Sequence, residues 1–177
     1  KILNANEIST ILHRLSFQLI EDHHDFSDTV IIAIQPRGVL LAERIVNFLI
    51  KESFKVQFGL LDITFYRDDF RRNEKVLKAN KTILDFSIEN KTVVLIDDVL
   101  YTGRTIRAAM GELFTFGRPA AIRLCVLVDR GHRELPIKAD YVGKNYPTSL
   151  KEHIHVHVKE VDGVDEVLLM EYIEENE

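Results

Sequence analysis

The sequence predicts an α/β fold, with a parallel sheet flanked by helices and a small antiparallel layer near the C-terminus. Continuous apolar runs rich in β-branched residues, at 29–34 and 91–96, are typical of strands buried on both faces. Segments with apolar residues at helical spacing alternate with these runs. Apolar residues make up 46% and charged residues 29% of the chain, which is typical of a folded domain rather than a disordered one.

The first elements are predicted from the spacing of apolar residues and from capping and turn residues between them. An apolar stripe predicts a helix over residues 6–22, with Asn6 as the expected N-cap and Asn4 as the alternative. A strand over 29–34 ends at a Gln-Pro-Arg-Gly turn, and a helix follows from about 39 to 52.

The same alternation continues along the chain. We expect a second strand over 55–64, a long polar loop over 65–81 and a third strand over 91–96. A helix then runs to about Phe116, and a fourth strand covers 121–128. Short alternating segments predict strands of a small separate layer at 139–143, 153–159 and 166–172. No linker is apparent, so a single domain over 1–177 with a core at about 25–130 is expected.

Composition excludes several classes. The 23 Lys and Arg residues against 28 Asp and Glu residues argue against a globally basic nucleic-acid binder, although a local basic patch stays open. The single cysteine, Cys125, cannot form an internal disulfide and is expected as a buried small hydrophobe in a cytoplasmic protein. No apolar run approaches the ~18 residues that a membrane span needs, so no membrane partner is expected.

The segment after the third predicted strand carries the chemistry. Asp97 and Asp98 directly follow that strand, where open α/β sheets place ligands. Thr102 and Thr105 flank Gly103, which allows close backbone approach to an anion at the start of a helix. Acids for hydroxyl groups beside amides for a phosphate predict a ribose 5-phosphate site. The alternative is a plain turn in which Asp98 and Thr102 act as caps.

Four blocks resemble one family: Val93-Val-Leu-Ile-Asp-Asp-Val-Leu-Tyr-Thr-Gly-Arg-Thr105, Asp62-Ile-Thr-Phe-Tyr-Arg-Asp-Asp69, Val128-Asp-Arg-Gly-His-Arg-Glu-Leu-Pro136 and Ala139-Asp-Tyr-Val-Gly-Lys-Asn145. They resemble, in order, the PyrR family of bifunctional pyrimidine-operon regulators and uracil phosphoribosyltransferases, within the type I phosphoribosyltransferase superfamily. The resemblance implies the type I phosphoribosyltransferase fold, with a small hood built from the N-terminal and C-terminal segments.

The resemblance also implies residue roles in binding phosphoribosyl pyrophosphate (PRPP). Asp97 and Asp98 would hold the ribose hydroxyls, and the turn of Tyr101, Thr102, Gly103, Arg104 and Thr105 would cradle the 5-phosphate. Pro36, Arg37 and Gly38 would form the pyrophosphate loop, in which the sequence does not reveal a cis bond. The expected catalytic residues are Arg37, Arg67, Asp97 and Asp98.

Two further segments complete the implied site. The loop at about 65–81 would be a flexible flap, with Tyr66, Arg67, Arg71 and Arg72 closing over pyrophosphate; for the last two, a solvated loop is the alternative. Asp129, Arg130 and Lys138 would contact the base, together with backbone groups at 137–143, and His132 is a site residue or a structural one. Some relatives with purine substrates have an acid where this chain has Tyr101, and the proton acceptor for uracil is not identified.

The implied reaction joins uracil to PRPP and yields UMP and pyrophosphate, with Mg²⁺ arriving bound to PRPP. The alternatives are an RNA-binding attenuation regulator that senses UMP or UTP, and a purine-base phosphoribosyltransferase. The family's RNA face includes the first helix, which here combines His13 and Arg14 with Phe17 and acidic residues. The resemblance also implies a homodimer or higher homo-oligomer. A patch for pyr leader RNA, or a merely solvated surface, would comprise Arg130, Arg133, Lys138, Lys144 and Lys151.

Three histidines alternate near the C-terminus. On a strand, His153, His155 and His157 would share one face. They predict either a transition-metal site or, more simply, an exposed strand.

Overall fold

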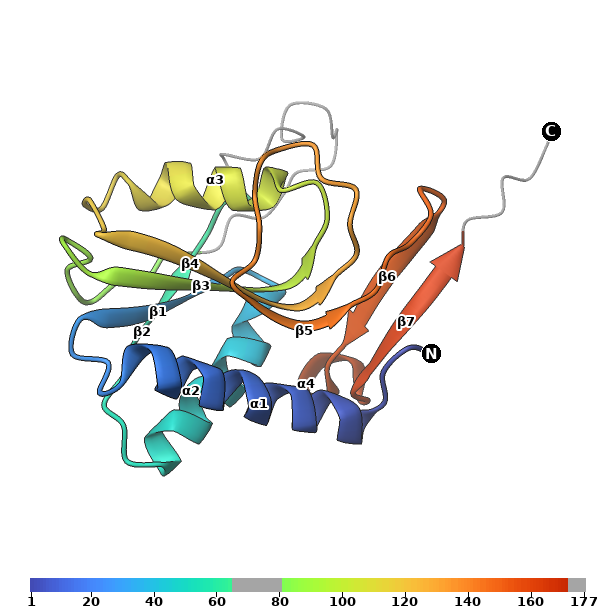
Figure 1. The fold of residues 1–177 in the computed structure, drawn as a ribbon, viewed down its shortest axis with the longest axis horizontal. Helices are drawn as coiled ribbons and strands as arrows, with labels where there is room; N and C mark the ends of the chain where they lie inside the picture. The colour runs from blue at the N-terminus through green and yellow to red at the C-terminus, as the bar shows by residue number, and fades with distance from the viewer. Residues whose placement is uncertain (65–80, 172–177) are drawn as a thin grey trace.

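The protein has a five-stranded parallel sheet at its centre (Figure 1). The computed structural model describes residues 1–64 and 81–171. The strand order is β2-β1-β3-β4-β5, and all four neighbouring pairs are parallel. The strands are β1 (Thr29–Ile34), β2 (Gln57–Leu61), β3 (Thr92–Leu100), β4 (Ala121–Asp129) and β5 (Tyr141–Asn145).

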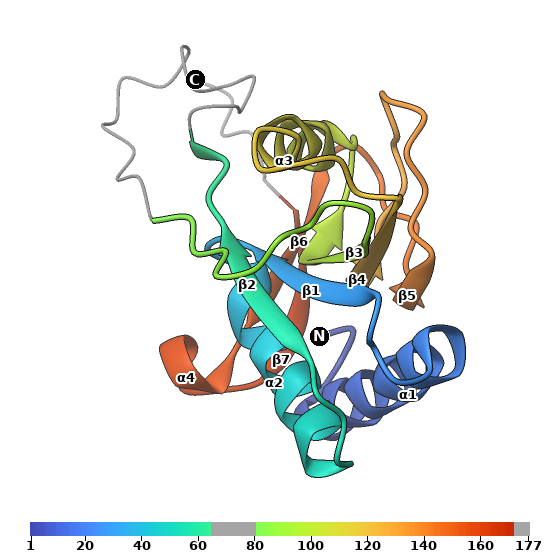
Figure 2. The ribbon, with the colours of Figure 1, turned by 90° about the vertical axis from the view of Figure 1, so that its left-hand side faces the viewer.

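Helices cover both faces of this sheet (Figure 2). α1 (Ala5–His23) and α2 (Gly38–Lys51) pack on one face, and α3 (Arg104–Leu113) packs on the other. Alternation along the strands divides the core accordingly. Val94 and Ile96 of β3 join the core under α1 and α2, whereas Val93 and Leu95 join the core under α3.

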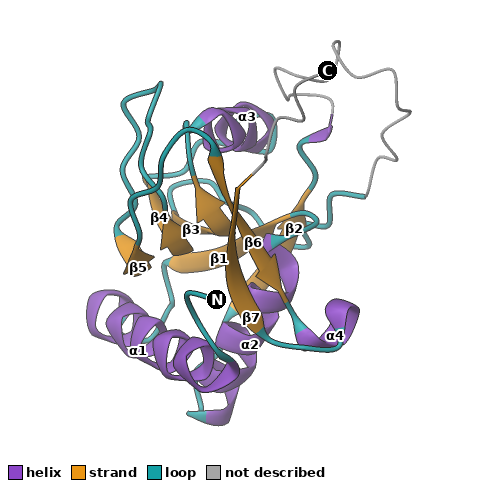
Figure 3. Cartoon of the chain, turned by 90° about the vertical axis from the view of Figure 1, so that its right-hand side faces the viewer, coloured by secondary structure: helices purple, strands orange, loops and turns teal. Residues whose placement is uncertain are grey.

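A small hood stands beside the carboxyl edge of the sheet (Figure 3). It comprises β6 (Glu152–His157), the short helix α4 (Lys159–Asp162) and β7 (Glu166–Glu171). The two strands are antiparallel, with Val156 opposite Val167. The N-terminal segment adds to the hood, because the Ile2 amide donates to the Val167 carbonyl at 2.8 Å. The segment before α1 therefore contacts the hood strand β7.

Local differences from the sequence-based expectations have clear causes. Asn4 rather than Asn6 caps α1, because the Asn4 side chain accepts from the Glu7 amide while the Glu7 carboxylate accepts from the Asn4 amide. This reciprocal pair needs a Glu three residues after the cap. β3 is longer than predicted and includes Asp97 and Asp98, because β4 continues to pair beside them.

The placement of β5 corrects a second expectation. We predicted residues 139–143 in a separate layer, but β5 pairs with β4 at the edge of the main sheet. Tyr141 explains the difference, since it is buried and hydrogen-bonds to His23 and Asp22 of α1. Arg14 of α1 also donates to the carbonyls of Val142 and Gly143. Within residues 1–64 and 81–171, no helix has the length and apolarity to cross a bilayer.

Candidate functional site

The acid pair lies near the carboxyl end of β3. Asp97 is buried and Asp98 is half-buried. The Asp97 carboxylate accepts from the Asp98 amide at 2.9 Å, and the Asp98 carboxylate accepts from the Val99 amide at 2.8 Å. Burial raises the pKa of Asp98, while hydrogen bonds to Asp97 and Val99 and the charge of Arg37 oppose that rise. The pair therefore offers hydrogen-bond acceptors at the edge where parallel sheets bind ligands.

The turn that follows is shaped by Gly103. This residue has φ +93° and is the N-cap of α3, a conformation that favours glycine. A Cβ there would also lie 3.2 Å from Cδ1 of Ile137. The Thr102 hydroxyl accepts from the Arg104 amide at 3.3 Å, so the turn is closed by a local side-chain bond rather than by a helix cap from Asp98. The N-terminus of α3 therefore follows the carboxyl end of β3 after a turn of three residues.

The predicted pyrophosphate loop lies between β1 and α2. Its Gln35–Pro36 peptide bond is cis, a point that the sequence left open. Arg37 is exposed, and its Nη1 donates to the Val156 carbonyl of the hood at 3.4 Å. Gly38 is buried against β3, where a Cβ would collide with the Ile96 carbonyl. Close packing on β3 is therefore a structural reason for glycine at this position.

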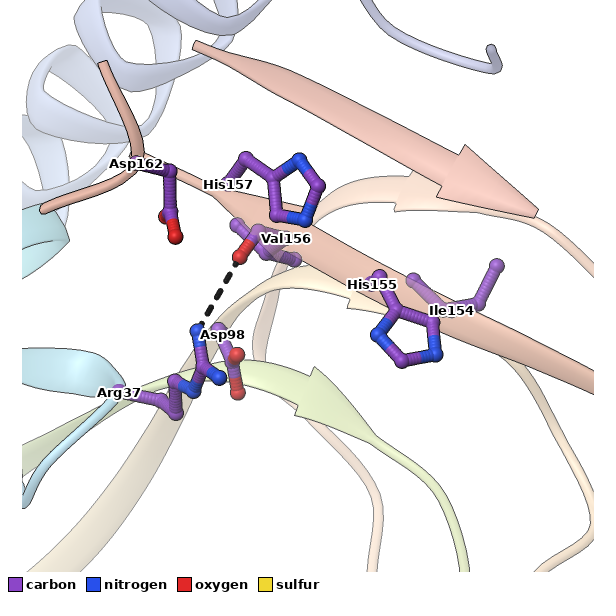
Figure 4. Close-up of a pocket in the computed structure, with 7 residues that line it drawn as sticks. All are labelled: Arg37, Asp98, Ile154, His155, Val156, His157 and Asp162. Carbon is purple, nitrogen blue, oxygen red and sulfur yellow. Dashed lines mark hydrogen bonds between the residues drawn. The ribbon is translucent and has the colours of Figure 1, made fainter. Parts of the chain in front are cut away.

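A polar cavity of about 150 Å³ lies between this loop and the hood (Figure 4). Arg37 and Asp98 point toward each other on its core side. Strand β6 and α4 close the opposite side, with the His155 ring on the strand near Asp98. The lining residues are Arg37, Asp98, Ile154, His155, Val156, His157 and Asp162. The cavity therefore combines core residues that the sequence singled out with hood residues that it did not assign to the site.

Arg133 ties the turn after β3 to the loop after β4. Its guanidinium donates to the Tyr101 carbonyl at 2.6 Å, to the Ile137 carbonyl at 2.8 Å and to the Asp129 carboxylate at 2.6 Å. The Thr102 carbonyl adds a second link, since it accepts from the Glu134 amide at 2.9 Å. The two loops thus form one connected wall of the site.

Arg130 supports this wall from inside. It is only 4% exposed, and its guanidinium lies 3.9 Å from the centre of the Tyr101 ring. The guanidinium also donates to Thr148 and to the carbonyls of Ser149 and Glu152. His132 contacts the Thr148 carbonyl and the edge of the Tyr101 ring, which gives it a structural role. Arg130 is consequently engaged internally, unlike the base-contacting and RNA-facing side chain that we expected.

The remaining predicted residues divide by position. Asp129 is engaged by Arg133 and by the Gly131 amide, whereas Lys138 is exposed beside this wall. Tyr66, Arg67, Arg71 and Arg72 lie outside the described residues. Of the cations in the predicted RNA patch, Lys138, Lys144 and Lys151 have side chains without the internal bonds that hold Arg130 and Arg133.

The sequence missed the contribution of the hood. Alternation predicted that His155 and His157 share a face, but not that this face borders the cavity, because the pairing of a terminal hairpin with a distant sheet leaves no local signal. Across residues 1–64 and 81–171, the structure contains no group of three or more side chains suited to a metal ion. Cys125 is buried as predicted, and burial raises the pKa of its thiol to about 12.

Comparison with known proteins decides the family. A family model described as a phosphoribosyl transferase domain matches residues 1–161. The bifunctional protein PyrR of Chloroflexus aurantiacus is 50% identical over 171 residues, covering 96% of this chain and 94% of the relative. That of Clostridioides difficile is 46% identical over 172 residues, covering 97% of both chains.

The chain belongs to the PyrR family. The predicted membership of this family of phosphoribosyltransferases, whose curated relatives are named bifunctional, is therefore confirmed. The Asp97–Thr105 segment of this PyrR-family chain lies inside the matched domain, as does the hood strand β6.

Solved structures agree with this family at the level of the fold. The hypoxanthine phosphoribosyltransferase of Trypanosoma cruzi superposes with a TM-score of 0.72 at 18% identity, covering 96% of this chain and 95% of that one. A hypoxanthine-guanine phosphoribosyltransferase from Bacillus anthracis gives a TM-score of 0.66 at 23% identity, covering 83% and 84%. The predicted phosphoribosyltransferase fold is confirmed for this PyrR-family chain.

Proposed function

We propose that this protein transfers the phosphoribosyl group of PRPP to uracil, giving UMP and pyrophosphate. One observation carries the proposal: the Asp97–Asp98 pair and the Gly103 turn end the same strand, and Asp98 lines one polar cavity together with Arg37. Carboxylates suit ribose hydroxyls, amides at a helix start suit a phosphate, and a guanidinium suits a diphosphate.

The chemistry assigns a task to each group. The bond between C1 of the ribose and the diphosphate oxygen breaks, a bond from uracil N1 to C1 forms, and N1 loses its proton. Arg37 neutralises the leaving diphosphate, while Asp97 and Asp98 hold the ribose hydroxyls so that C1 faces the base. Arg67 is proposed to join Arg37 on the diphosphate when the site closes.

Mg²⁺ is the proposed cofactor and would arrive with PRPP. The residues present fit such a complex, because Asp97 and Asp98 offer hard oxygen atoms beside the ribose position. The ion supplies charge neutralisation of the leaving diphosphate. Asp97 and Asp98 would hold the ribose hydroxyls that face it.

The base would bind against the wall formed by the loop after β4. Asp129 and Lys138 are the proposed side-chain contacts, with backbone groups of residues 137–143 meeting the polar edge of uracil. Arg130 shapes this wall through Tyr101 rather than by reaching the base. Tyrosine is a weak base at neutral pH, so Tyr101 is not proposed as the proton acceptor.

An assay of base preference tests the proposed function. Incubation with PRPP, Mg²⁺ and either uracil or hypoxanthine should yield UMP with uracil and no IMP with hypoxanthine. IMP formation without UMP would instead assign a purine-base phosphoribosyltransferase. If neither UMP nor IMP forms, whether or not PRPP is hydrolysed, the proposed transfer to a base is contradicted.

A regulatory function is the second candidate, and the bifunctional relatives favour it. The proposed partner is pyr leader RNA, bound by Lys138, Lys144 and Lys151 and modulated by UMP or UTP. Because phosphate contacts dominate RNA affinity, three cations would give weak, salt-sensitive binding. Electrophoretic mobility shifts with a pyrimidine leader RNA at moderate salt, with and without UMP, test this. Binding lost in a variant that replaces all three lysines by Gln would support it, and no binding to the parent protein would exclude it.

A homodimer or higher homo-oligomer in the cytoplasm is also proposed. Phe17 of α1 and Ile50 of α2 are each 54% exposed, and such apolar side chains favour contact with another subunit. Light scattering after size-exclusion chromatography measures the number of subunits.

A further inference from the structure

Two histidines of the hood border the cavity that also contains Arg37. His155 and His157 are two residues apart on β6, so their side chains project from the same face of the strand. Both line the cavity together with Arg37 and Asp98 (Figure 4). Nothing in the roles assigned to the acid pair, the Gly103 turn or the pyrophosphate loop uses these imidazoles.

The tautomer of His157 follows from its partner. His157 Nδ1 lies 3.3 Å from the Glu166 carboxylate, which also contacts the Lys1 ammonium at 2.8 Å. Hydrogen bonds from Lys1 and His157 lower the pKa of Glu166, so this carboxylate is ionised and can only accept. Nδ1 therefore carries the hydrogen, and Nε2 is the ring nitrogen left to meet a ligand. A neutral His157 presents an acceptor there, whereas an imidazolium presents a donor.

The charges around the cavity define what it can bind. Arg37 contributes a cation from the core, and His155 and His157 can each contribute another from the hood. The facing acids are Asp98 from β3 and Asp162 from α4, the latter accepting from the Val158 amide at 2.8 Å. The volume is about 150 Å³, and the cation Arg37 beside two imidazoles makes phosphate oxygens the ligand atoms that this lining suits.

We propose that His155 and His157 bind the diphosphate of PRPP and the pyrophosphate product together with Arg37, and that His157 takes up a proton when it does so. This inference rests on the proposed function and adds to it a hood contribution to the leaving-group site. Arg37 already donates to the Val156 carbonyl between the two histidines, so the guanidinium and both imidazoles can converge on one anion. An imidazolium donates from both ring nitrogens, so we expect tighter binding at about pH 6 than at about pH 8.

Calorimetric titration of magnesium pyrophosphate tests this, at about pH 6 and about pH 8, in two buffers of different ionisation enthalpy. The variants are His155→Gln, His157→Gln and the double variant, because glutamine keeps a polar side chain that cannot gain a proton. His153→Gln is the matched control, since it lies on the same strand outside the cavity lining. Melting temperatures verify that each variant folds, and His155→Gln keeps the test valid should loss of the Glu166 contact unfold the others.

Near pH 6, we expect each single variant to bind pyrophosphate roughly tenfold more weakly, as for one charge-assisted hydrogen bond. Part of the proton uptake on binding comes from protonation of pyrophosphate itself. His157→Gln should remove the additional uptake that the parent protein shows. His153→Gln should match the parent. If the parent binds pyrophosphate and converts uracil while the double variant has the same affinity and proton uptake, the inference is wrong and the proposed function stands. If the parent binds neither pyrophosphate nor PRPP at either pH, both fall.

Discussion

At the scale of single residues, the site depends on side chains that the rest of the protein does not bond internally and that can therefore contact a ligand. Arg37 makes one 3.4 Å bond to the hood and is otherwise exposed, whereas Arg130 and Arg133 are fully engaged in holding loops together. Residue type alone could not distinguish these arginines. Their different uses follow from burial, which depends on the distant segments that pack around them.

Arg37→Ala should lower kcat roughly 100- to 1,000-fold, the loss typical of removing one preorganised donor to developing charge. Because Arg37 is exposed, the free energy of unfolding should change by less than about 0.5 kcal/mol. Steady-state kinetics and chemical denaturation measure the two effects. Arg118→Ala is the control at another exposed arginine, and unchanged turnover in Arg37→Ala would refute its role.

Replacing both Asp97 and Asp98 by Asn should raise the PRPP concentration needed for half-maximal rate, because amides are weaker acceptors for the ribose hydroxyls. An effect of roughly tenfold or more is expected from losing charge-assisted bonds. Initial rates over a PRPP series at saturating uracil measure it. Asp28→Asn provides a control at an exposed acid away from the cavity, and an unaltered PRPP response would count against the ribose assignment.

At the scale of elements, helix and strand identity followed from the sequence, but boundaries and partners did not. The Asp97–Thr105 motif was located because its residue types cluster locally. The hood's face on the cavity and the place of β5 could not be found, because each depends on pairing with residues far along the chain. Asn4, the alternative cap in the sequence, is distinguished from Asn6 by its reciprocal pair of hydrogen bonds with Glu7.

Gly103→Ala should disturb the turn that opens α3. Its φ of +93° penalises any side chain by about 1–2 kcal/mol, and the added methyl would press on Ile137 at 3.2 Å. We expect weaker PRPP binding as well as lower stability. Gly163→Ala is a matched control, with φ +76° but no atom within 4 Å of the new Cβ. Titration of PRPP into each variant should show weaker binding by Gly103→Ala than by Gly163→Ala. Equal affinities would show that the turn does not hold the ligand.

Arg44 fastens the hood to α2. Its guanidinium donates to Glu160 at 2.6 Å and 3.0 Å, and to Asp165 at 2.7 Å and 3.1 Å. Arg44→Lys should lose this two-sided geometry, raise hydrogen exchange across residues 152–171 and lower kcat/KM several-fold. Arg123→Lys, which affects an exposed 3.5 Å pair with Asp140, is the control. Unchanged exchange in the hood would show that its packing alone holds it.

At the scale of the whole molecule, a partly buried polar network connects α1 to Thr29 of β1 and Tyr141 of β5. The Tyr141 hydroxyl donates to Asp22 at 2.7 Å, so it accepts from His23 Nε2 at 2.9 Å. His23 Nδ1 then accepts from the Thr29 hydroxyl at 3.2 Å. This arrangement requires a neutral imidazole, and burial lowers the pKa of His23 accordingly.

The free energy of unfolding should therefore fall as the pH drops below about 6.5, the ordinary pKa of histidine. The unfolded chain then binds a proton that folded His23 resists, so acid favours unfolding. Denaturation curves at about pH 5.5 and pH 7.5 measure this difference. His23→Gln should reduce the dependence, whereas His13→Gln on the exposed face of α1 should not. An equal dependence in parent and His23→Gln would rule out this origin.

The backbone hydrogen bonds that join Ile2 and Leu3 to Val167 bear on how the protein folds during synthesis. The hood beside the cavity needs β7 as well as residues 2 and 3, so a growing polypeptide on the ribosome lacks this contact until β7 has emerged. Sheet and helices can pack earlier, since their partners lie closer together along the chain. The competence to use an activated sugar should thus arise only when β7 meets the segment that contains Ile2 and Leu3.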